Sequence, residues 1–146
     1  MAYKGKYKVK DPKKYVGDHT KVVYRSLWER QTFRWLEDNP EVAKWNSEDI
    51  VIPYLCATDG KKHRYFIDLY VEMKNGDKYL IEIKPKKETQ VPAKGKKKTR
   101  RYISEQLTYA KNMSKWNAAQ QFAKDNGIKF QVWTEDTLRG LGIKVL

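Results

Sequence analysis

The sequence has few of the residues that cross-link small proteins or carry them into membranes. Its 146 residues include one cysteine and two histidines, and there is no apolar run of about 20 residues. Cys56 has no partner for an internal disulfide. With only His19 and His63 beside it, we expect no zinc site, and we interpret both histidines as solvated surface residues. No signal-peptide pattern is present, so we expect a soluble, intracellular single domain with no membrane partner.

Acidic residues are also scarce relative to basic ones. The chain has 31 lysines and arginines against 18 acids, which gives a net charge of +13. Residues 1–14 carry net +5 and residues 84–101 carry net +8, so these two segments account for the whole excess. Such confinement is typical of proteins that bind the phosphates of double-stranded DNA without reading its sequence, although a charge run can also be merely solvated. The candidate phosphate contacts are Lys86, Lys87, Lys94, Lys96, Lys97, Lys98, Arg100 and Arg101.

Two neighbouring segments alternate in the manner of β-strands. In residues 64–73 and 78–84, the odd positions are apolar and the even positions are mixed. The intervening Asn75-Gly76-Asp77 predicts a hairpin with a three-residue loop, because an odd loop length keeps all the apolar residues on one face. That register pairs Asp68 with Lys84.

Three polar side chains on the mixed faces could perform chemistry: Asp68, Glu82 and Lys84. A hard cation such as Mg²⁺ (or Mn²⁺) takes oxygen ligands, which Asp68 and Glu82 can supply together with the backbone carbonyl of Ile83. Such an ion polarises a phosphoryl group and generates a hydroxide nucleophile, while Lys84 would orient the attacking water or stabilise developing charge. The pattern predicts metal-dependent phosphodiester hydrolysis. Two simpler explanations stay open: a chance Glu-x-Lys, as at Glu72, and a plain Asp68–Lys84 ion pair.

These strands carry a resemblance to a known family. Tyr65-Phe66-Ile67-Asp68, followed by Tyr79-Leu80-Ile81-Glu82-Ile83-Lys84, resembles the core of the PD-(D/E)XK nucleases, with Ile67 in place of the motif's proline. Residues 24–84 are similar to the N-terminal domain of TnsA-type transposon endonucleases, and the whole chain resembles the head completion nucleases of T-even-like tailed phages. The resemblance implies a restriction-endonuclease-like α/β fold, an α+β arrangement with a mixed sheet in the order helix, three strands, helix, strand.

The resemblance also implies that Glu29, on the first helix, binds the metal or positions the water. Ser26 and Glu29 have the spacing of a capping box, however, in which the glutamate only satisfies the start of the helix. Four further residues are candidates for supporting the carboxylates or contacting the DNA backbone, namely Tyr24, Arg25, Gln106 and Tyr109. The last two resemble, one residue out of register, a Gln and Tyr pair of RecB-like and Cas-type nucleases.

The pattern divides the chain into a basic N-terminal arm, residues 1–23, and one nuclease domain, residues 24–146, with a basic loop at residues 85–101. Helices are predicted at 27–38 and 102–125. Strands are predicted at 43–55, interrupted by the polar residues 46–49, at 64–73, at 78–84 and, as a last central strand, at 128–133. The second helix is expected to bury Ile103, Leu107, Ala110 and Met113 on one side.

The function that the resemblance implies is a metal-dependent DNA endonuclease that processes DNA ends during phage head completion, after packaging. It would act in the host cytoplasm, with phage portal or head proteins as partners, and the protein would associate with the virion. A homodimer would be the simplest arrangement for cutting both strands with one small site. Two alternatives stay open: a TnsA-like transposase nicking subunit that needs partner proteins, and a structural virion protein that binds DNA or the portal without catalysis.

Overall fold

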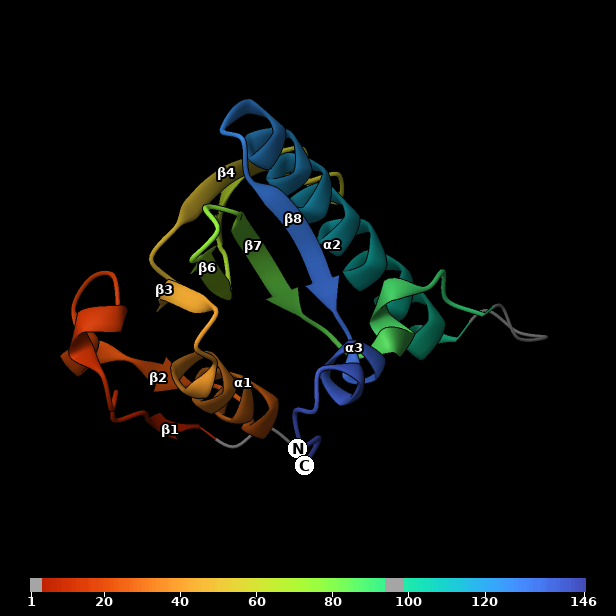
Figure 1. The fold of residues 1–146 in the computed structure, drawn as a ribbon. Helices are drawn as coiled ribbons and strands as arrows, with labels where there is room; N and C mark the ends of the chain where they lie inside the picture. The colour runs from red at the N-terminus through yellow and green to blue at the C-terminus, as the bar shows by residue number, and fades with distance from the viewer. Residues whose placement is uncertain (1–3, 94–98) are drawn as a thin grey trace.

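The computed structural model describes residues 4–93 and 99–146, and Figure 1 shows a layer of strands with helices on both sides. The strands are β1 (Gly5–Lys6), β2 (Val23–Tyr24), β3 (Val42–Ser47), β4 (Val51–Leu55), β5 (Lys62–Phe66), β6 (Leu69–Met73), β7 (Lys78–Ile83) and β8 (Lys129–Trp133). The helices are α1 (Leu27–Asp38), α2 (Arg100–Asp125) and α3 (Glu135–Gly140), with 3-10 turns η1 (Pro12–Lys14), η2 (His19–Lys21) and η3 (Lys86–Thr89). This mixed content confirms the predicted fold class.

The main sheet has four strands in the order β3-β6-β7-β8. Its neighbouring strands are antiparallel except β7 and β8, which are parallel. A parallel pair needs a long crossover connection, and α2 lies in the connection between these two strands. The prediction that β8 is a central strand was wrong, because the crossover brings it beside β7 and no described strand lies beyond it.

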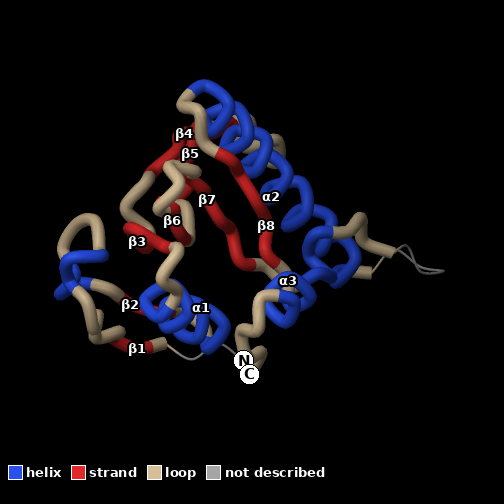
Figure 2. The backbone as a smooth tube through the Cα atoms, in the orientation of Figure 1, coloured by secondary structure: helices blue, strands red, loops and turns tan. Residues whose placement is uncertain are grey.

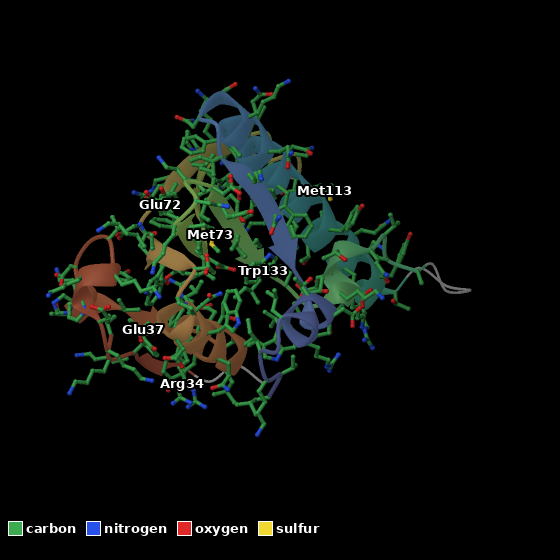
Figure 3. All side chains as sticks on the ribbon, viewed as in Figure 1. Arg34, Glu37, Glu72, Met73, Met113 and Trp133 are labelled. Carbon is green, nitrogen blue, oxygen red and sulfur yellow. The ribbon has the colours of Figure 1, made fainter. Side chains whose placement is uncertain are left out.

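The sheet separates two hydrophobic cores. The first lies toward α1 and includes Phe33 and Trp133, and the second lies toward α2 and includes Leu80 and Trp116. Figure 2 shows α1 and α3 on one side of the strands and α2 on the other. In Figure 3, Trp133 lies at the end of β8 near α1 and α3, whereas Met113 lies on α2. Both faces of the sheet are therefore covered.

The predicted strand at residues 64–73 is interrupted at Ile67 and Asp68, between β5 and β6. β5 leaves the main sheet and pairs with β4 in a separate two-stranded ribbon. Residues two apart in a continuous strand share a face. Across the interruption they do not, because Tyr65 and Ile67 lie in the core toward α2 whereas Leu69 lies in the core toward α1.

The β6–β7 hairpin has the predicted odd loop length in a different register. A backbone hydrogen bond of 2.8 Å from Met73 to Asp77 closes a loop of residues 74–76. Each residue of β6 therefore pairs two positions away from the predicted register, which preserves the apolar faces. The predicted pairing of Asp68 with Lys84 was wrong for this reason.

The long helix α2 begins two residues earlier than predicted, and its buried residues are Asn112, Trp116, Ala119 and Ala123. The prediction that Ile103 and Leu107 are buried was wrong, since their exposed fractions are 43% and 54%. The first turns of α2 extend past the strands and lie beside η3 (Figure 1), so the helix packs on the sheet only further along. No helix within the described ranges, α2 included, is long and apolar enough to cross a membrane.

The basic N-terminal segment is packed against the domain rather than extending from it. β1 pairs with β2, and Tyr7 and Val22 lie in the core toward α1. The Tyr7 hydroxyl donates a hydrogen bond to Glu37 of α1. The ammonium group of Lys14 donates to the carbonyl of Glu37 at 3.0 Å and to that of Asn39 at 2.8 Å. At least two lysines of the predicted arm are therefore part of the folded domain. Lys14 caps the end of α1, and Lys6 lies in β1.

Candidate active site

Asp68 occupies the interruption between β5 and β6. Its Oδ2 accepts a hydrogen bond from the backbone N–H of Ile83 at 2.8 Å. This contact fixes the Asp68 carboxyl at the end of β7, beside Glu82. Ile83 thus contributes its N–H to the site, and the role of its carbonyl as a metal ligand stays a prediction.

Glu82 lies on β7 and is only 4% exposed. It shares the face of Leu80, which packs toward α2. Because the interruption before β6 brings Tyr65 to that same face, the Tyr65 hydroxyl donates to Glu82 Oε2 at 2.6 Å. Burial and the neighbouring Glu82 charge raise the pKa of Tyr65, so its hydroxyl remains a donor. Tyr65 was not among the predicted site residues, because one continuous strand over residues 64–73 would place it on the opposite face from Glu82.

Burial of the carboxyl raises the pKa of both Asp68 and Glu82. The charge of Glu82 raises the pKa of Asp68 further. For Glu82, the Tyr65 hydroxyl opposes the effect of burial, and so do the ammonium charges of Lys84 and Lys115. A cation between two buried carboxyls whose charges interact would stabilise both in their ionised form.

Lys84 lies beside Glu82, with 3.8 Å between its Nζ and Glu82 Oε1. The Lys84 side chain is 26% exposed, whereas that of Glu82 is 5% exposed. Among the described ion pairs, Lys84 is paired with Glu82 and not with Asp68. The simpler explanation of an Asp68–Lys84 ion pair was therefore wrong, and Lys84 connects the buried carboxyl to the surface.

Lys115 of α2 is a second lysine at the site, and it was not among the predicted site residues. Its Nζ lies 5.3 Å from the centre of the Tyr65 ring. Burial lowers the pKa of Lys115, and the charge of Glu82 opposes this shift. Lys115 follows the buried Asn112 by three residues and precedes the buried Ala119 by four, so it shares their side of the helix. That spacing was the available sequence signal.

Glu29 approaches from α1, on the other side of the sheet. Burial and the charge of Asp68 raise its pKa to about 7, while the backbone N–H of Arg25, 3.2 Å from Oε1, opposes the shift. Ser26 caps the helix as predicted, because its Oγ accepts the N–H of Glu29 at 3.2 Å. The Glu29 side chain, however, bonds to Arg25 rather than to the backbone of Ser26. Only half of the capping box is formed, and the carboxyl stays close enough to Asp68 for their charges to interact.

Glu48 is a further acid at the site, and it was not among the predicted site residues. It lies where β3 ends before β4, within the interruption predicted at residues 46–49. Its φ of 56° is uncommon for a residue other than glycine, and its N–H lies 3.1 Å from the carbonyl of Ile67 and 3.3 Å from that of Asp68. Arg25 pairs with Glu48 at 2.9 Å. Of the supporting candidates, Arg25 is thus the one that the structure brings to the site.

The other three supporting candidates lie elsewhere. Tyr24 is part of the β1–β2 ribbon. Gln106 donates to the hydroxyl of Tyr102 at 2.8 Å on the exposed start of α2. Tyr109 lines a cavity of about 650 Å³ between α2 and the segment that follows η3. Within the described residues, none of the three forms a hydrogen bond with Glu82. For Gln106 and Tyr109, the reason is that the start of α2 extends past the sheet.

The basic segment is described only in part. Outside the described residues lie Lys94, Lys96, Lys97 and Lys98. Exposed to solvent are Lys86, Lys87, Arg100 and Arg101. The Nζ of Lys86 lies 3.2 Å from Asp136, and its backbone N–H donates to Glu135 at 2.6 Å, so η3 is fixed to α3 directly after β7. This brings the exposed lysines of η3 close in sequence and space to Lys84.

Comparison with known proteins identifies the family. Residues 39–135 match the family described as TnsA-like endonuclease N terminal. The chain belongs to the TnsA-like endonuclease family. The matched range runs from before β3 to the end of β8, and it contains Asp68, Glu82 and Lys84. Glu29 precedes it.

A phage protein is similar to this TnsA-like chain over nearly all of its length. It is the head completion nuclease of Enterobacteria phage T4, which is 49% identical over 148 residues, covering 99% of each chain. Both comparisons confirm the resemblance predicted from the sequence. The two chains therefore share the TnsA-like region together with the segments on either side of it.

Proposed function

We propose that this TnsA-like protein is a metal-dependent DNA endonuclease that processes DNA ends during phage head completion. The observation that carries the proposal is the pair of desolvated carboxyls, Asp68 and Glu82, next to the ammonium group of Lys84. Family membership supports the endonuclease activity. The similarity to a head completion nuclease supports the setting and makes phage head or portal proteins the proposed partners.

Asp68 and Glu82 fit a hard divalent cation such as Mg²⁺ or Mn²⁺. Both offer carboxylate oxygens, the donor type that these ions prefer, and burial raises the pKa of both, which a nearby cation opposes. The Ile83 carbonyl and Glu29 are the further ligands that we propose. When bound, such a cation polarises a phosphoryl oxygen and lowers the pKa of its bound water.

The remaining side chains hold the carboxylates and supply positive charge. The Tyr65 hydroxyl occupies Glu82 Oε2 and so leaves Oε1 for other contacts. We assign to Lys84, 3.8 Å from that oxygen, the orientation of the attacking water or the stabilisation of charge on the phosphoryl oxygens. Lys115 adds a second positive charge close to Tyr65. Arg25 neutralises Glu48 at the edge of the site.

The substrate that we propose is double-stranded DNA, held through its phosphates and without reading of its sequence. The net charge of +13 and its concentration around residues 84–101 support this. The proposed contacts include the exposed side chains that follow β7 or begin α2, which are Lys86, Lys87, Arg100 and Arg101. A second copy of the chain would supply the second active site for a double-strand cut.

The experiment that tests the proposal is cleavage of linear and supercoiled DNA in Mg²⁺ or Mn²⁺. Asp68→Asn and Glu82→Gln should abolish cleavage, and Lys84→Ala should lower the rate by roughly 10²–10³. Glu72→Gln is the matched control, because Glu72-Met73-Lys74 repeats the Glu-x-Lys spacing at the end of β6. Full activity of Glu82→Gln would refute the assignment.

Family membership favours a second candidate, a nicking subunit that cuts only with partner proteins. Wild-type protein that is inactive alone and becomes active with a transposase partner would support it. The third possibility is a structural virion protein without catalysis. If the protein has that role, Glu82→Gln should leave the phage yield unchanged.

A further inference from the structure

A second group of metal-ligating side chains lies at the turn between β4 and β5. The Sγ of Cys56, a carboxylate oxygen of Asp59 and a ring nitrogen of His63 all lie within 4.8 Å of one another. His63 is near the start of β5 and Asp68 follows its end. Five residues of extended chain span about 16 Å, so this group is separate from the nuclease carboxyls.

We propose that Cys56, Asp59 and His63 form a binding site for a transition-metal cation, with Zn²⁺ as the expected ion. A thiolate, an imidazole and a carboxylate are the ligand types that Zn²⁺ takes, and a solvent molecule can complete the tetrahedron. A thiolate ligand selects against Mg²⁺, which prefers oxygen. The expectation of no zinc site counted only cysteine and histidine, and the turn adds the carboxylate that was left out.

The turn directs the three side chains toward one point. The Cys56 N–H donates to the carbonyl of Lys61 at 2.9 Å, which closes the turn. Asp59 Oδ1 accepts the N–H of Lys61 at 2.9 Å, and Oδ2 lies 2.7 Å from Nε2 of His63. Ligand atoms around a tetrahedral Zn²⁺ are about 3.3–3.6 Å apart. The observed separations therefore need only small side-chain adjustments.

The exposure of the three residues is graded. Cys56 is 2% exposed, whereas the side chains of Asp59 and His63 are 38% and 41% exposed. The core thus encloses the thiol, and the fourth ligand would come from the solvent side. The plain alternative is an Asp59–His63 ion pair, with the Cys56 thiol hydrogen-bonded only to Thr58 at 3.0 Å.

A bound cation would stabilise the contact between this turn and α2. The backbone N–H of Ala57, inside the turn, donates to Ser114 Oγ at 3.1 Å. Ser114 precedes Lys115, which lies close to Tyr65 and Glu82. The expected role of the cation is therefore structural, and it does not depend on the proposed nuclease activity.

Titration of the purified protein with Co²⁺ tests the site. The chain has one cysteine, so a thiolate-to-cobalt charge-transfer band reports on Cys56 alone and the oxygen ligands of the nuclease site do not contribute to it. We expect one equivalent of Co²⁺ to produce the band and Zn²⁺ to abolish it by displacement. Cys56→Ser should lose the band, and the control His19→Gln should retain it.

The surface variants His63→Gln and Asp59→Asn should each weaken Co²⁺ binding by at least roughly 10–100-fold. That is the loss when only a hydrogen-bond partner of a metal ligand is removed, and removing the ligand itself should cost no less. Zn²⁺ should raise the melting temperature of the wild type more than that of His63→Gln. Stabilisation from the nuclease carboxyls would persist in the variant, so the difference isolates this site. Two results would overturn the proposal: no band with the reduced protein, or a band that survives both His63→Gln and Asp59→Asn.

Discussion

Replacing Glu29 by glutamine is expected to stabilise the protein at neutral and alkaline pH. Burial and the charge of Asp68 raise the Glu29 pKa from 4.5 to about 7. The folded protein therefore binds this proton more tightly than the unfolded chain, and its free energy of unfolding falls as the pH rises between these two values. With about 1.4 kcal/mol for each pKa unit, the loss above pH 7 is on the order of 3 kcal/mol.

Glutamine removes the charge, and its amide oxygen can still accept the hydrogen bond from Arg25. Urea unfolding of the metal-free protein at about pH 4 and about pH 8 measures the effect. We expect similar stabilities of variant and wild type at the lower pH and an advantage for Glu29→Gln on the order of 3 kcal/mol at the higher pH. The exposed Glu41→Gln serves as the control and should show no such dependence. An equal difference at both pH values would refute the reasoning.

Four further predictions concern the site and the fold. Tyr65→Phe should shift the pH–rate profile of DNA cleavage to higher pH, because the Tyr65 hydroxyl lowers the pKa of Glu82; an unshifted profile would contradict this. Lys115→Met should lower the cleavage rate with the circular dichroism spectrum unchanged, whereas Lys111→Met, exposed on the same helix, should not. Lys86→Ala combined with Lys87→Ala should reduce the log–log salt slope of DNA binding by up to about 1.8, and an unchanged slope would remove both from the DNA contacts. Trp45→Ala, at a fully buried position, should lower the free energy of unfolding by about 3–5 kcal/mol, measured by urea unfolding.

The parts of the fold that the sequence predicted depend on neighbouring residues. α1 has the predicted bounds, residues 27–38, because the Ser26 side chain caps its start and Pro40 disfavours helix at the residue before it. The odd loop between β6 and β7 followed from the requirement that apolar residues share one face. The loop can consist of residues 74–76 or of residues 75–77. Both loops have three residues and keep the apolar side chains on one face, so the pattern could not decide between the two registers.

The parts that the sequence did not predict depend on contacts between distant segments. Ile103 and Leu107 have the spacing of a buried helix face, but the sequence does not state how far α2 extends past the sheet. The interruption at Asp68 contains no glycine or proline, the usual signals of a break. It results from the pairing of β5 with β4 and from the hydrogen bond between Asp68 and the N–H of Ile83. Tyr65 could be assigned to Glu82 only once that interruption was known.

The departures from regular structure gather at the candidate active site. Asp68 interrupts a strand, Glu48 has a left-handed backbone, and burial raises the pKa of Glu29 and Glu82. Each of these features costs stability, and neutral residues in regular conformations would fold at least as well. A chain that keeps several desolvated acids within reach of one another therefore has a requirement other than folding. Burial and like-charge repulsion lower the stability of the cation-free protein, and a bound cation would offset both. The stability gain of Glu29→Gln and the proposed catalytic loss of Asp68→Asn therefore have the same electrostatic origin.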